Sequence, residues 1–110
     1  WSTFSNTSGS YIIVADSGNA YTPVVFRDLV SEQMIDVLFV DGNHSTDMAY
    51  LDFKNYYPFV RSGGIVAFHD VQFPEPFKAF NDAAELIKVD ATIIHDEARN
   101  SLGIGYFIKP

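Results

Sequence analysis

The segment from Ile35 to His44, IDVLFVDGNH, decides how this chain is interpreted. A short apolar run leads into Asp41, Gly42 and His44, and a helix start follows directly. In an open α/β sheet the ligand crevice lies outside the carboxyl ends of the strands, so side chains that emerge there face whatever binds. The segment therefore predicts a buried parallel strand that ends in functional residues.

The same pattern recurs about twenty-five residues later. Residues 63–68, GGIVAF, form another short apolar run, which ends in His69 and Asp70. If the two runs are adjacent parallel strands, two carboxylates and two imidazoles meet on one rim, those of Asp41, His44, His69 and Asp70. Such a rim indicates a site rather than a core.

Composition limits the classes of function. The chain of 110 residues is 47% hydrophobic, which predicts a single globular domain over residues 1–110. Its net charge is −7 and it has no Lys/Arg cluster, so we expect no nucleic-acid partner and no membrane-surface partner. Cysteine is absent, which removes disulfides and thiolate metal sites and fits a cytoplasmic protein.

Strand and helix patterns alternate along the chain, which predicts an α/β fold. Apolar, β-branched runs predict strands at 11–15, 35–40, 65–68, 91–95 and 102–108. Helical spacing predicts helices at about 22–33, 45–58 and 74–88, the last with Phe77, Phe80, Ala83, Ala84 and Ile87 buried. Residues 1–10 are expected to form a loop, and residues 61–64 a turn. This order predicts a mostly parallel sheet with a C-terminal antiparallel hairpin.

These residues carry a resemblance to a known family. The run 35–44, then Asp52, then residues 58–70 (PFVRSGGIVAFHD) are similar to the C-terminal portion of a class I S-adenosylmethionine-dependent methyltransferase. The small-molecule O-methyltransferase group with the macrocin and mycinamicin enzymes is the nearest in pattern, and catechol O-methyltransferase is more distant. The resemblance covers roughly residues 11–110 and implies a Rossmann-like sheet.

The resemblance also implies a metal site and a base. In relatives, acids that end the fourth and fifth strands bind a divalent cation, which chelates two substrate oxygens; here these acids are Asp41 and Asp70. Mg²⁺ suits an oxygen-rich site. His69 stands where relatives carry an acid, and Mn²⁺, Fe²⁺ or Zn²⁺ becomes more suitable if its imidazole is a ligand. His44 occupies the position of the base, which would take the proton of the hydroxyl that is methylated.

The cofactor would be S-adenosylmethionine and the substrate a small hydroxylated molecule such as a sugar, a polyketide or a catechol. Asp16 and Ser17 fall where relatives contact the adenine, and Gly42 would let the backbone approach a ligand closely. A tight turn alone also explains Gly42. Asp52 is interpreted as a solvated helix residue or a member of an ion pair on the helix surface.

One part of the family pattern is missing. The glycine-rich loop after the first strand does not occur before Tyr11, and the chain begins with Trp1 rather than Met. We therefore expect an N-terminally truncated domain that lacks its first two strands. A missing N-terminal segment, or a second copy in a homo-oligomer, would complete the sheet.

Two other interpretations remain open. A partial or degenerate methyltransferase-like fold could serve as a binding or interaction module, since a truncated sheet exposes strand edges and apolar surface. A relative of the cephalosporin hydroxylase type would keep the fold and change the chemistry.

Overall fold

The computed structural model describes residues 2–5, 11–14, 16–29, 35–42, 44–95 and 103–110. Its elements are β1 (Ser2–Ser5), β2 (Tyr11–Val14), α1 (Thr22–Leu29), β3 (Ile35–Val40), α2 (Thr46–Tyr56), a short 3₁₀ helix (Tyr57–Phe59), β4 (Val60–His69), α3 (Pro74–Ile87), β5 (Thr92–His95) and β6 (Gly103–Ile108). No helix among the described residues is long and apolar enough to cross a membrane.

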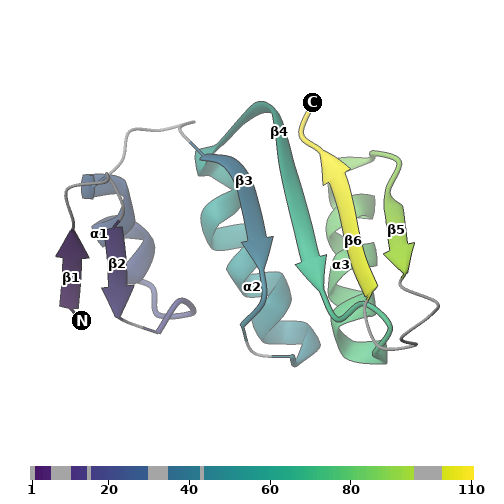
Figure 1. The fold of residues 1–110 in the computed structure, drawn as a ribbon, viewed down its shortest axis with the longest axis horizontal. Helices are drawn as coiled ribbons and strands as arrows, with labels where there is room; N and C mark the ends of the chain where they lie inside the picture. Colours follow the sequence, from purple (N-terminus) through teal and green to yellow (C-terminus); the bar gives the residue numbers. More distant parts are fainter. Residues whose placement is uncertain (1, 6–10, 15, 30–34, 43, 96–102) are drawn as a thin grey trace.

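The main sheet has four strands in the order β3-β4-β6-β5 (Figure 1). β3 and β4 are parallel, and β6 is antiparallel to both of its neighbours, so β3, β4 and β5 share one direction. This confirms the predicted α/β class and the C-terminal hairpin. β1 and β2 form a separate two-stranded sheet, and no described strand pairs with the free edge of β3. The arrangement is that of a partial Rossmann-like sheet.

Two sequence-based assignments of loops were wrong. Ser2–Ser5 forms a strand that pairs antiparallel with Tyr11–Val14, because pairing with a partner overrides the polar local composition. Residues 61–64 lie inside β4 rather than in a turn. Gly63, with φ of 81°, and Gly64 exchange backbone hydrogen bonds with Lys109, and the register of β3 against β4 shifts beside them. The two glycines therefore mark an irregularity in a strand.

The helices begin and end for local reasons. Ser45 caps α2 by accepting a hydrogen bond from the backbone N–H of Met48, and Pro58 lies in the 3₁₀ turn that follows the helix. Pro74 provides the first turn of α3, which ends at Lys88 in the left-handed conformation. Several predicted boundaries of strands and helices fall outside the described part of the chain, at residues 15, 30–34 and 96–102.

Phenylalanine rings from both layers form the core. Phe53 of α2, Phe68 of β4 and Phe107 of β6 are each 1% exposed. The ring centroid of Phe53 lies 6.2 Å from that of Phe68 and 6.1 Å from that of Phe107. Phe80 of α3 adds a fourth ring, 5.8 Å from Phe68. Phe77, which was predicted to be buried, is 41% exposed, because the helix turns Pro76, Ala79 and Ala83 toward the sheet instead.

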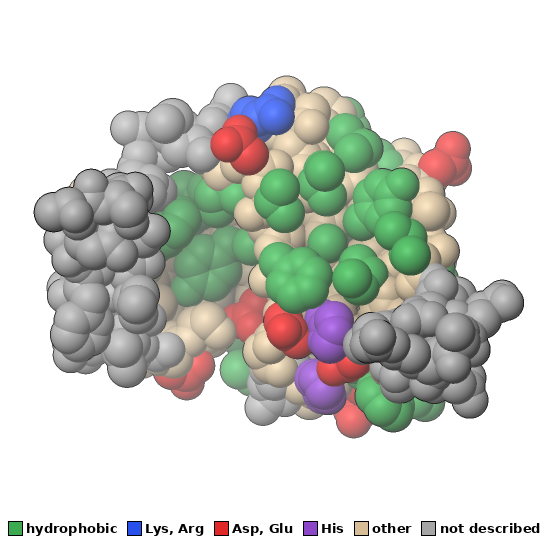
Figure 2. Space-filling model, in the orientation of Figure 1, with side chains coloured by type: hydrophobic (Ala, Val, Ile, Leu, Met, Phe, Trp, Pro, Cys, Tyr) green, Lys and Arg blue, Asp and Glu red, His purple; other side chains and the backbone are tan. Residues whose placement is uncertain are grey.

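No helix of the described residues covers the other face of the sheet. α2 and α3 lie together behind the sheet in the view of Figure 1, and apolar side chains cover the face toward the viewer in Figure 2. Six of them line a shallow depression of about 480 Å³: Ile65, Ala67, Ile94, Ile104, Tyr106 and Ile108. The Asp and His side chains of the predicted site gather at the lower edge of this apolar face.

Gly105 leaves room for the ring of Phe80. A Cβ atom at this position would lie 2.6–2.8 Å from three ring carbons of Phe80. We predict that Gly105→Ala lowers the free energy of unfolding by about 1–3 kcal/mol, as overpacking of a core does, measured by urea denaturation. In a Phe80→Leu background, Gly105→Ala should lower the free energy of unfolding by less. An equal cost of Gly105→Ala in both backgrounds would show that the added methyl group does not meet the ring of Phe80.

Candidate active site

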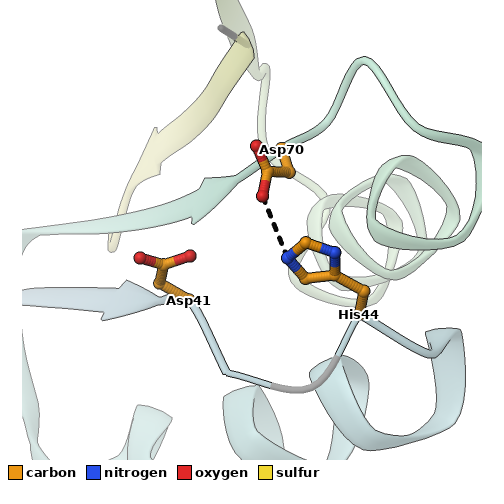
Figure 3. Close-up of side chains that lie close together, drawn as sticks. All are labelled: Asp41, His44 and Asp70. Carbon is orange, nitrogen blue, oxygen red and sulfur yellow. Dashed lines mark ion pairs between the residues drawn. The ribbon is translucent and has the colours of Figure 1, made fainter. Parts of the chain in front are cut away.

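Two neighbouring strands position the candidate site. β3 and β4 run parallel with Val40 opposite Phe68, so Asp41 and His69 emerge side by side at one edge. Asp70 follows at the end of β4, and His44 lies in the connection just before the cap of α2. The structure thus brings together the four side chains that the sequence placed on one rim. Figure 3 shows three of them, Asp41, His44 and Asp70, converging from these elements.

The distances within this cluster are those of direct contact. His44 Nε2 lies 2.9 Å from Asp70 Oδ2, and His69 Nδ1 lies 3.0 Å from both Asp41 Oδ1 and Asp70 Oδ2. One ligand-type atom from each of Asp41, His44 and Asp70 lies within 4.8 Å of the others. The geometry therefore admits His44 as a third metal ligand, whereas the sequence had given that place to His69.

The donor atoms fit a divalent cation. His69 Nδ1 is buried and has no hydrogen-bond partner among the described residues, although two carboxylate oxygens lie 3.0 Å away. Two cis ligands of an octahedral ion with bonds of about 2.1 Å lie about 3 Å apart. The distances from His69 Nδ1 to the two carboxylates are thus similar to those between ligands of one octahedral ion.

Asp70 has an unusual backbone conformation. Its φ is 60°, in the left-handed region that costs energy for most residues but that Asp tolerates better. The turn is held by hydrogen bonds from Phe73 N to Asp70 O, 3.0 Å, and from Val71 N to Gly103 O, 3.2 Å. Backbone strain of this kind gathers at functional sites, where surrounding contacts maintain it.

A pocket of about 290 Å³ adjoins the cluster at Gly42. Leu38, Phe39 and Val40 of β3 line it together with Ser17, Asp52 and Tyr56. Two residues that were predicted to bind cofactor, Ser17 and Gly42, therefore meet at one pocket. Asp16 is not among its lining residues; it is exposed, and its Oδ1 accepts a hydrogen bond from the backbone N–H of Gly18.

Asp52 corrects the interpretation made from the sequence. It is not a solvated helix residue, since it is 8% exposed and accepts a hydrogen bond of 2.7 Å from Ser17 Oγ. Burial raises the pKa of its carboxyl group above the ordinary value, the bond from Ser17 lowers it in part, and nearby Asp16 raises it. Its position three residues after Ala49 and next to Phe53, both buried, was the signal that could have placed it on the inner face of α2.

Tyr56 shares this environment. Its hydroxyl donates a hydrogen bond of 3.1 Å to the backbone oxygen of Ser17. Burial, together with the charges of Asp52 and Asp16, raises the pKa of Tyr56 to about 12. Asn55 Nδ2 also donates a hydrogen bond of 3.4 Å to the backbone oxygen of Ser17. Helix α2 therefore holds Ser17 by three side chains, those of Asp52, Asn55 and Tyr56.

A comparison with protein families identifies the fold. A methyltransferase domain family matches residues 6–71, a span that is more than half of the chain and contains Asp16, Asp41 and Asp70. The chain belongs to this methyltransferase domain family. The methyltransferase part of the resemblance found in the sequence is thereby confirmed at the level of the domain.

One curated protein is similar to part of this chain. An uncharacterized protein of Acanthamoeba polyphaga mimivirus is 45% identical over 38 residues, which are 34% of this chain and 17% of that protein. The match thus spans less than a fifth of the relative's length. No solved structure matches the chain.

The buried carboxyl group of Asp52 gives a prediction about pH. Folding raises the pKa of Asp52. The contribution of this group to the free energy of unfolding is therefore fully present below its pKa in the unfolded chain, about 3.9, and is lost as the pH rises through its higher pKa in the folded chain. Asp52→Asn keeps an acceptor for Ser17 and cannot ionise. We predict that its stability relative to the unmodified chain is greater at pH 7 than at pH 4, measured by urea denaturation.

Ser17→Ala supplies the matched control. It removes the hydrogen bond that lowers the pKa of Asp52, so the pH-dependent loss of stability should move to higher pH. An Asn variant whose stability difference is the same at pH 4 and pH 7 would contradict the assignment.

Proposed function

We propose that this methyltransferase domain transfers a methyl group from S-adenosylmethionine to an oxygen of a small hydroxylated molecule, with the help of a divalent metal. The observation that carries the proposal is the convergence of Asp41, His44, His69 and Asp70 at the carboxyl edge of β3 and β4. Within the family we propose a relation to the macrocin and mycinamicin O-methyltransferases, because Asp41, His44 and Asp70 stand at the positions of that group's acids and base, although His69 replaces an acid.

In the proposed site, Asp41 and Asp70 hold the metal, and His69 Nδ1 supplies a nitrogen ligand from its buried position. The bound metal would be Mg²⁺ or, with the imidazole, a softer divalent ion; it would orient the acceptor and lower the pKa of its hydroxyl. His44, whose side chain is 54% exposed, would then accept the hydroxyl proton. The bound cofactor would supply the methyl group from its sulfonium to the acceptor oxygen and would be released as a thioether.

The pocket beside Gly42 is the proposed place of the cofactor. Ser17 and Gly42 line it, and Asp16 lies in the same loop as Ser17. Its volume of about 290 Å³ suits only part of a nucleoside cofactor, at the lower limit of ligand pockets. We therefore propose that two strands from a segment upstream of Trp1 pair with the free edge of β3 and complete both the sheet and the pocket.

The first test is calorimetry of S-adenosylhomocysteine, with and without Mg²⁺. It uses the chain of residues 1–110 and the longest form that its gene encodes. We predict that the longest form binds both, and that Asp41→Asn weakens Mg²⁺ binding by more than about tenfold, since even groups outside the ligand shell cost that much. Asp36→Asn is the matched control, because this carboxylate pairs with Arg61 near the opposite end of β3. Failure of the longest form to bind S-adenosylhomocysteine would overturn the proposal.

The second test concerns the base. We predict that His44→Gln lowers the rate of methyl transfer by about 10² to 10⁴, the usual contribution of a general base, and leaves Mg²⁺ affinity unchanged. The measurement is single-turnover transfer from labelled S-adenosylmethionine to an acceptor found by screening hydroxylated compounds. Loss of Mg²⁺ binding in this variant would instead make His44 a metal ligand.

A binding role is the second candidate, and the uncovered sheet face favours it. Val37, Phe39, Ile94 and Ile108 are 47–55% exposed on that face, although sheets with parallel strands are normally covered on both sides. A second copy of the chain, or a segment upstream of Trp1, would cover this surface. A monomer in analytical ultracentrifugation that binds no cofactor would remove support from both candidates.

A further inference from the structure

Gln72 connects Asp70 to the start of β6. The backbone N–H of Gly103 donates a hydrogen bond of 3.0 Å to Gln72 Oε1. This bond fixes which end of the amide points toward β6, so the Nε2 end turns toward Asp70. Nε2 lies 3.4 Å from Asp70 Oδ1, a long hydrogen bond between partly buried groups.

The packing around Gly103 keeps Gln72 in place. A Cβ atom on Gly103 would lie 2.9 Å from Gln72 Oε1 and 3.0 Å from the backbone nitrogen of Gln72. Val71 also donates a backbone hydrogen bond to Gly103 O. The first residue of β6 is therefore packed closely against the turn that carries Asp70, and a side chain at Gly103 would push against Gln72 and Val71.

The two oxygens of Asp70 are thereby used for different contacts. Oδ1 faces the amide of Gln72, whereas Oδ2 lies 2.9 Å from His44 Nε2 and 3.0 Å from His69 Nδ1. A carboxylate can rotate about its Cβ–Cγ bond, which would take Oδ2 away from the imidazoles. A donor on Oδ1 opposes this rotation and, being neutral, adds no charge to the site.

We propose that Gln72 is a positioning residue, which holds the carboxylate of Asp70 so that Oδ2 is presented to the metal and to His44. This inference rests on the proposed function, in which Asp70 is a metal ligand. In this role Gln72 acts through the carboxylate of Asp70.

The test compares Gln72→Met, Asp70→Asn and the double variant. Met has nearly the size of Gln and lacks the amide, so it removes the donor to Asp70 and the acceptor of Gly103 N with little change in volume. We expect Gln72→Met to weaken binding of Mn²⁺ about tenfold, measured by electron paramagnetic resonance, and to have no further effect once Asp70 is Asn. An equal loss in both backgrounds, or no loss in the first, would overturn the proposal.

A second measurement is independent of metal binding. In ¹⁵N-correlated NMR spectra, the side-chain amide resonances of Gln72 should shift in Asp70→Asn and stay in place in Asp41→Asn. Unshifted resonances in both variants would refute the contact with Asp70. Absence of Mn²⁺ binding in the unmodified chain, together with the expected NMR shifts, would count against the metal site of the proposed function and not against the placement of Gln72.

Discussion

The parallel pairing of β3 with β4 is the constraint on which the rest of the structure depends. It places Val40 opposite Phe68, and so Asp41 beside His69 at the end of both strands. The same pairing needs a crossover, which α2 supplies, and α2 brings His44 to its N-terminal end. A shift of the register by one residue would exchange the two faces of a strand and separate Asp41 from His69.

The cluster could be predicted because it depends on strand ends. Two apolar runs of strand length, each followed by an acid and a histidine, showed where the two strands end. Because the carboxyl ends of parallel strands meet at one edge of a sheet, the residues that follow them were expected to lie close together. The proximity of Asp41, His44, His69 and Asp70 followed from these two facts. Their division into ligands and base did not, because imidazole nitrogens of His44 and His69 both lie about 3 Å from Asp70.

What the sequence did not reveal depends on contacts between distant segments. Asp52 is buried because the loop of Ser17, 35 residues earlier, closes over it, and no local pattern states this. Gly63 and Gly64 have the composition of a turn, but both form backbone hydrogen bonds with Lys109, and β4 continues through them. β1 likewise exists through its partner β2. In each case a hydrogen-bonding partner far along the chain overrides the local preference.

Helix α2 connects two parts of the candidate site, the cluster around His44 and the neighbouring pocket. Its N-terminal end adjoins the imidazole of His44, and the carboxylate of Asp52 lies on its inner face under the neighbouring pocket. Asp52 lies six positions after Thr46, which is about 9 Å along an α-helix. The helix thus fixes the distance between the cluster around His44 and the pocket that Asp52 lines. Inserting one residue between Thr46 and Asp52 would turn Asp52 by about 100° around the helix axis. The number of residues in this part of α2 therefore sets the position of Asp52 relative to His44.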